Sequence, residues 1–153
     1  SIALGSGRMS KPNIIAEARA QDCPQMLADQ IPFAKAMGIT FAREDDLVLG
    51  QMAFDQHLIG DIGIAALHGG AIGTLLESTA IFTLLWEVER TKIPKTISLT
   101  VEYLRSGRPK PTYASAQITR LGRRVAAVRA IAWQSDRDKP IAAAYANFLL
   151  VPL

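Results

Sequence analysis

The chain has 153 residues, which is the length of one domain and enough to bury a sizeable core. Hydrophobic residues make up 49% and charged residues 20%, as in ordinary soluble globular proteins. One cysteine excludes an intrachain disulfide and a paired-cysteine metal site, and two histidines are too few for a histidine-rich metal cluster. Lys and Arg outnumber Asp and Glu by 17 to 14, and aromatic residues do not alternate with these bases. We therefore expect a cytoplasmic protein whose partner is a phosphate-bearing small molecule rather than nucleic acid.

The first half of the chain is predicted to contain short helices, two strands and one long helix. Residues 1–10 have the character of a disordered, vector-derived tail, and residues 11–153 are expected to form a single domain. Apolar residues recur at helical spacing after the tail until Gly38, with an interruption at Pro32. Two short strands then follow over 38–45 and 46–54, and residues 55–67 lack a clean period, which predicts a loop. The long helix is expected from about Gly70 to Glu89.

The second half of the chain is predicted to consist of strands. The stretch "KTISLTVEYL" alternates, so that Ile97, Leu99, Val101 and Tyr103 share one face. This order of elements predicts an α+β fold in which an antiparallel sheet of about six strands wraps around one central helix. Because that helix is apolar nearly all round, it needs cover on more than one side, and a second copy of the chain would supply it. The remaining strands are predicted over 112–121, 125–134 and 141–151, the first two joined by a hairpin turn over 122–124.

One carboxylate stands out in the long apolar stretch. Glu77 is the one charged side chain between Gly69 and Trp86, and a carboxylate buried without a partner is costly, so we expect a functional reason for it. The charge of Glu77 and the two glycines at the start of residues 69–86 also argue that this stretch is not a membrane span. His68, Gly69 and Gly70 stand at the predicted start of the helix, where unpaired N–H groups favour developing negative charge. The rise from there to Glu77 is roughly 10 Å or more, so a site that uses both is expected to combine two subunits.

The run "LHGGAIGTLLESTA", followed by "TISLTVEYLRSGRP" and "LGRRVAAVRA", resembles the hotdog-fold acyl-CoA thioesterases, and the branch it resembles most is the phenylacetate-degradation type. The resemblance covers residues from about 30 to 150. It implies the hotdog fold, in which an antiparallel sheet wraps a central helix, and homodimers that pair into tetramers. It also implies hydrolysis of acyl-CoA thioesters without a metal or a separate cofactor, because coenzyme A enters as part of the substrate.

The resemblance assigns roles to particular residues. Glu77 matches the catalytic acid, as general base or nucleophile, and Gly69 matches the residue whose backbone N–H polarises the thioester carbonyl. His68 lies beside it, and Thr96 matches a Ser or Thr that helps to hold water. Asp61 stands in the loop where relatives often carry Asn or Gln, and an acid there would repel Glu77 unless it is protonated. Residues expected to contact the substrate and its coenzyme A phosphates are Gly70, Arg105, Arg108, Gly122, Arg123 and Arg124.

Two other functions compete with this interpretation. Hydratases and dehydratases of the same fold also act on acyl thioesters, but they place a histidine and an acid differently from the spacing of His68 and Glu77. A non-catalytic acyl-CoA-binding or sensor module would keep the arginines and is expected to lose the carboxylate. The sequence leaves open the acyl group, the choice between dimer and tetramer, and the choice between a covalent intermediate and direct attack by water.

Overall fold

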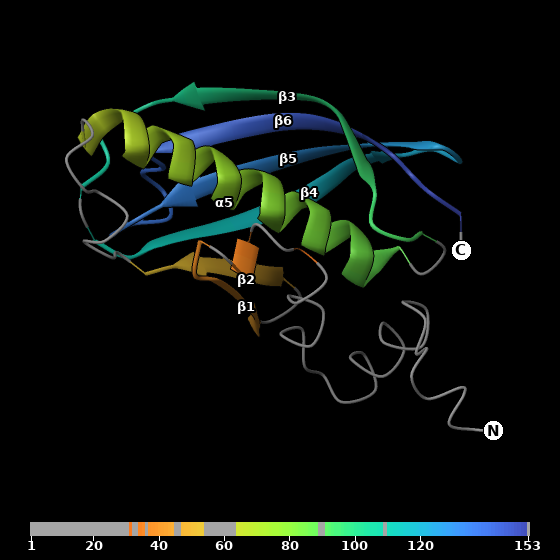
Figure 1. Cartoon of the computed structure of the whole chain (residues 1–153), viewed down its shortest axis with the longest axis horizontal. Coiled ribbons are helices and arrows are strands. Elements are labelled where there is room, and N and C mark those ends of the chain that lie inside the picture. The colour runs from red at the N-terminus through yellow and green to blue at the C-terminus, as the bar shows by residue number, and fades with distance from the viewer. Residues whose placement is uncertain are drawn as a thin grey trace.

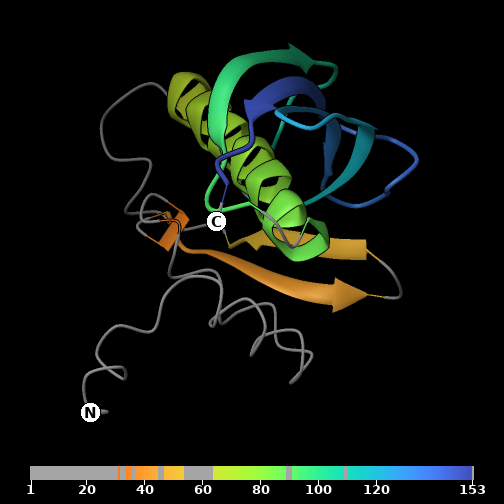
Figure 2. The same ribbon diagram turned by 90° about the vertical axis from the view of Figure 1, so that its right-hand side faces the viewer.

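The computed structural model describes residues 31, 34–35, 37–44, 47–53, 64–88, 91–108 and 110–152. The predicted tail, most of the predicted N-terminal helical stretch and Asp61 lie outside these residues. The described part forms a six-stranded sheet that curves around a long helix (Figures 1 and 2). Its elements are β1 (Ile39–Glu44), β2 (Leu47–Met52), α5 (Ile64–Glu87), β3 (Lys95–Tyr103), β4 (Thr112–Leu121), β5 (Val125–Trp133) and β6 (Ala142–Leu149).

The sheet has the order β1-β2-β4-β5-β6-β3, and all neighbouring strands are antiparallel. The chain leaves β2, passes through α5 along the concave face and returns as β3 at the opposite edge (Figure 1). The prediction of an antiparallel six-stranded sheet around one long helix is confirmed, and this arrangement is the hotdog fold. The strands begin and end close to the predicted residues because their period-2 patterns and turn residues are clear.

Small side chains on the concave face of the sheet let the helix approach closely. The helix-facing positions of the central strands are mostly alanine, and each of these alanines is at most 5% exposed. A Cβ on Gly50 of β2 would collide with the Thr79 hydroxyl of α5, so this position requires glycine. Larger side chains fill the space beyond, where Phe41 stacks on Phe82 with ring centroids 4.2 Å apart. The alanines are Ala114, Ala116, Ala126, Ala130, Ala132, Ala142, Ala144 and Ala146.

The predicted start of the long helix was wrong. The sequence places it near Gly70, but α5 begins at Ile64, so residues 64–67 are helical rather than part of a loop. The segment "IAALH" consists of residues that tolerate a helix, and the glycine pair after it costs about 1 kcal/mol per glycine, which tertiary packing outweighs. The stretch Gly69–Glu87 has the length and composition of a membrane span, yet 67% of it is buried against the rest of the chain, which identifies it as a core helix.

Strand β3 forms an edge of the sheet and exposes apolar side chains. Among the described residues it pairs with β6 on one side and with nothing on the other. Ile97, Tyr103 and the adjoining Leu104 are 56%, 55% and 48% exposed. A long apolar edge strand offers unpaired N–H and C=O groups to another strand, so this edge is suited to pairing with a second chain.

Candidate active site

A half-exposed stripe runs along the second to fourth turns of α5. Gly69, Gly70, Gly73, Thr74 and Glu77 lie three or four residues apart, so they share one face of the helix, and none of them is buried. Further along the helix this face is closed by buried apolar residues. We call these five residues the glycine stripe. Because a Cβ on Gly70 would meet nothing within 4 Å, the stripe leaves open space at its glycine end.

The carboxylate of Glu77 has a hydrogen-bond partner. The Thr96 hydroxyl donates to Glu77 Oε2 at 2.8 Å, and the Glu77 side chain is partly exposed. The expectation of an acid buried without a partner is therefore wrong, because the helix turns this position toward the stripe and away from its packed face. One carboxylate oxygen is held by Thr96, which fixes the orientation of the other.

A β-bulge directs Thr96 toward the helix. Thr96 pairs with Phe148, which is fully buried on the helix side, whereas Ser98 pairs with the exposed Asn147. Residues opposite each other in an antiparallel pair share a face, so Thr96 and Leu99 lie on the same side although they are three positions apart in the sequence. The register shift between Thr96 and Ser98 makes this possible, since one extra residue in a strand re-aims its neighbours. Strict alternation would have turned Thr96 away from Glu77.

Tyr103 contacts the other end of the stripe, and the sequence prediction missed it as a site residue. Its hydroxyl donates to the Gly69 carbonyl oxygen at 2.8 Å (from β3 to α5). Cβ atoms built on Gly69 and Gly73 would lie 3.8 and 3.6 Å from the same hydroxyl, so the tyrosine ring tip rests between these two glycines. The available signal was the alternation of β3, which places Tyr103 on the helix-facing side with Leu99 and Val101.

The glycine pair is not at the helix terminus. In a helix that begins at Ile64, the first four N–H groups lack an intrahelical acceptor, and Gly69 is the sixth residue. Its N–H is therefore directed to the carbonyl oxygen four residues earlier. His68 also lies within the helix. The expectation that this pair stands at the helix start with unpaired N–H groups is corrected by the position of Ile64.

The predicted arginines fall into two groups at opposite ends of the molecule. Arg105 and Arg108 follow the end of β3, where Tyr103 contacts Gly69. Arg123 and Arg124 are exposed in the β4–β5 turn next to Val125, which lies across β6 from Lys95 at the far end of β3. Within one subunit the fold therefore does not bring the two groups together.

Three of the residues predicted to contact coenzyme A, which are Arg105, Arg108 and Gly122, form hydrogen bonds within the chain through side-chain or backbone groups. Arg105 donates through Nη1 to the Pro140 carbonyl oxygen at 2.7 Å, and the backbone N–H of Arg108 donates to Gln134 Oε1 at 3.0 Å. The Gly122 N–H donates to the Val125 carbonyl oxygen at 2.9 Å, and a Cβ on Gly122 would approach that oxygen to 3.0 Å. Gly122 is therefore explained by the tight hairpin turn it closes.

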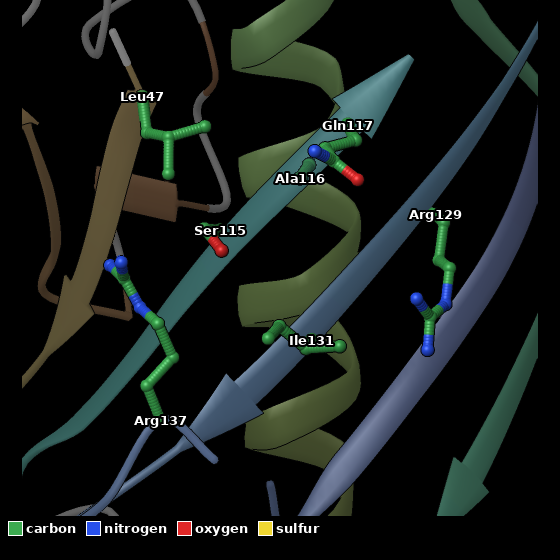
Figure 3. Close-up of a pocket in the computed structure, with 7 residues that line it drawn as sticks. All are labelled: Leu47, Ser115, Ala116, Gln117, Arg129, Ile131 and Arg137. Atoms are coloured by element: carbon green, nitrogen blue, oxygen red, sulfur yellow. The ribbon is translucent and has the colours of Figure 1, made fainter. Parts of the chain in front are cut away.

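A separate cavity of about 180 Å³ lies on the other side of the sheet (Figure 3). The helix passes behind the strands in this view, so the cavity is remote from the glycine stripe. Two cations flank it: the Arg137 guanidinium lies 4.4 Å from the Trp133 ring centroid, and that of Arg129 lies 5.9 Å from the Tyr145 ring centroid. The cavity is lined by Leu47, Ser115, Ala116, Gln117, Arg129, Ile131 and Arg137.

Comparisons with known proteins show the family to which this chain belongs. The family model described as "Acyl-CoA thioesterase N-terminal domain" matches residues 59–149, which include the glycine stripe, Thr96 and Tyr103. The medium/long-chain acyl-CoA thioesterases YigI of Salmonella typhimurium and Escherichia coli K12 are each 27% identical to this chain over 141 residues. Each match covers 82% of this chain and 90% of the relative. The chain belongs to the acyl-CoA thioesterase family and is a thioester hydrolase of the hotdog fold.

Solved structures agree with this fold. A protein of Chromobacterium violaceum is 38% identical with a TM-score of 0.72, and the match covers 91% of this chain and 97% of that one. A phenylacetic acid degradation-related protein of Ralstonia eutropha has a TM-score of 0.66 at 19% identity, with 78% and 91% of the two chains covered. At that identity the likeness concerns the fold alone, and assignment to the phenylacetate branch stays a prediction.

Proposed function

We propose that this chain hydrolyses medium- or long-chain acyl-CoA thioesters with Glu77 as general base or nucleophile. The acyl length is taken from the names of the YigI relatives. The observation that carries the catalytic assignment is the hydrogen bond from Thr96 to Glu77 Oε2 on a stripe that is otherwise glycine and threonine. It presents an oriented, partly exposed carboxylate at one end of a stripe whose glycine end has open space at Gly70.

The chemistry requires one water molecule and no cofactor beyond the coenzyme A of the substrate. As general base, the free oxygen of Glu77 takes a proton from water while the water oxygen attacks the thioester carbon. The carbon–sulfur bond then breaks, and the departing thiolate receives the proton, which leaves a free acid and coenzyme A. As nucleophile, the carboxylate itself attacks and forms an anhydride that water hydrolyses. Thr96 orients the carboxylate in either route.

The proposed site combines two subunits. Gly69 and Glu77 are eight residues apart on α5, a rise of about 12 Å, which is too far for both to act on one bond within a single helix. The open, apolar edge of β3 supports pairing of two copies about a two-fold axis, with a dimer of dimers as the larger assembly. In such a pair, the Gly69 end of one helix faces Glu77 of the other.

Gly69 is proposed to polarise the thioester carbonyl with its N–H group. Since that N–H is directed into the helix, the turn before it has to open when substrate binds. The two consecutive glycines that follow this turn weaken the helix next to it, because each costs about 1 kcal/mol relative to alanine in a helix. His68 and Gly70 would then line the opened turn. Arg105, Arg108, Arg123 and Arg124 are proposed to contact coenzyme A phosphates, with one group supplied by each subunit, and a cytoplasmic location stays a prediction.

The proposed function is tested by measuring thiol release from short-chain, long-chain and aryl-CoA substrates. Wild type, Glu77→Gln and the control Glu102→Gln, which alters an exposed carboxylate on β3, are compared. We expect turnover of the longer substrates, loss of about a hundredfold or more in Glu77→Gln and no change in the control. Equal turnover by Glu77→Gln and wild type would remove Glu77 from the mechanism.

A further inference from the structure

Strand β3 contacts the glycine stripe through two side-chain hydrogen bonds, one near each end. Thr96 at the start of the strand donates to Glu77, and Tyr103 at its end donates to the Gly69 carbonyl oxygen, both at 2.8 Å. Gly69 and Glu77 are the two residues to which the proposed function gives chemical roles. The same strand therefore contacts both of these residues, which in the proposed dimer belong to different sites.

The position of Tyr103 is not explained by burial. Its side chain is 55% exposed, so the ring contributes little to the core, and a hydrogen bond from an exposed hydroxyl adds little to stability. Its specific contact is with one backbone atom, the Gly69 oxygen, in a helix segment where two adjacent glycines leave the backbone unusually free to move.

We propose that Tyr103 is a positioning residue, which holds the Gly69–Gly70 peptide in the orientation that thioester hydrolysis requires. The Gly69 carbonyl and the Gly70 N–H belong to one planar peptide unit, so a bond to the oxygen fixes the direction of that N–H. The Gly69 N–H, which is proposed to polarise the thioester carbonyl, belongs to the preceding peptide unit. Only the φ and ψ of Gly69 separate the two units, so anchoring the Gly69 oxygen restricts the positions that this N–H can take. This inference rests on the proposed function, and it assigns Tyr103 no contact with the reacting atoms.

The contribution of the Tyr103 hydroxyl is distinguished from that of its ring by comparing wild type, Tyr103→Phe and the control Tyr145→Phe. Tyr145 is 45% exposed, lies on the outer face of β6 and contacts Arg129 rather than α5. Steady-state hydrolysis of a long-chain acyl-CoA gives kcat and KM, and hydrogen exchange followed by NMR reports the amides of α5. A fourth protein carries 4-aminophenylalanine at position 103, which restores a donor at the ring tip.

We expect Tyr103→Phe to lower kcat about 10- to 100-fold and to keep KM within about twofold of wild type. A misplaced Gly69 backbone affects the geometry of the reacting groups more than it affects substrate binding. Exchange of the Gly73 amide, whose helical acceptor is the Gly69 oxygen, becomes faster while amides in the strands keep their rates. The amino variant recovers most of kcat, and Tyr145→Phe matches wild type. A merely structural role would instead change exchange throughout the chain and leave kcat per folded molecule intact.

The proposal is overturned if kcat of Tyr103→Phe stays within about twofold of wild type while Glu77→Gln is impaired. It is equally overturned if exchange of the Gly73 amide does not change. Should wild type itself release no thiol, the proposed function fails. The exchange measurement then decides by itself whether Tyr103 holds the Gly69 backbone, because it needs no turnover.

Discussion

The carboxylate of Glu77 is held by a hydroxyl that comes from a different element, 19 residues further along the chain. The sequence identified both partners, Glu77 because it is the one charge in an apolar stretch and Thr96 through the family resemblance. It did not predict their contact, because the β-bulge that turns Thr96 toward the helix has no clear signature in the alternating pattern. Tyr103 was missed for a related reason, since a hydroxyl that reaches a helix carbonyl is a tertiary contact.

Replacing Thr96 with valine tests the orientation of Glu77. Valine keeps the shape but cannot donate to Oε2, so we expect kcat to fall about tenfold or more with little change in the melting temperature, since Thr96 is exposed. Thr96→Ser retains the donor and should keep most activity. The control is Thr100→Val on the outer side of β3, opposite Tyr145. Full activity in Thr96→Val would show that Glu77 does not need this hydrogen bond.

At the scale of elements, the strands were predicted more accurately than the helix. Period-2 alternation and the turn residues define the ends of β4 and β5 well. The start of α5 could not be located from sequence, because its first turn contains no acidic residue that would signal a helix N-terminus. The glycine pair is therefore inside the helix, where glycine lowers stability. A side chain at position 70 would not collide with the chain itself, so packing does not explain why Gly70 is glycine.

Gly70→Ala is expected to stabilise the protein and weaken the enzyme. The new Cβ meets nothing within 4 Å, so the free energy of unfolding should rise by up to about 1 kcal/mol in denaturant titrations. Thiol release should fall, because the added methyl group enters the space proposed for substrate. Gly50→Ala is the steric contrast, since its Cβ collides with the Thr79 hydroxyl and should destabilise the protein by about 1–3 kcal/mol. Gly70→Ala that is both more stable and fully active would show that substrate does not use this space.

At the scale of the whole molecule, one property of α5 predicts both the fold class and pairing with a second copy of the chain. A helix apolar nearly all round needs cover on several sides, and the sheet provides it on the concave side (Figure 2). The strand order was not predicted, because sequence patterns identify strands but not which of them pair. That order places β3 at the edge, where Ile97 and Tyr103 are exposed.

The proposed pairing through β3 is tested by the mass of the assembly in solution. We expect light scattering to give a dimer or a dimer of dimers for wild type and a smaller species for Ile97→Lys, because a charge on an edge strand opposes strand pairing. Val125→Lys, at a comparably exposed position of β5, is the control and should keep the wild-type mass. A monomeric wild type that still turns over substrate would contradict the shared site.

The central claim, that each site joins the glycine end of one α5 to Glu77 of another, is tested most directly by complementation. Glu77→Gln and Gly70→Leu subunits with different affinity tags are co-expressed, and pairs that carry both tags are purified. A mixed pair holds one intact site out of two, so we predict about half of the wild-type turnover, although each variant by itself is inactive. Mixed pairs as inactive as both parents would show that each subunit builds its site alone.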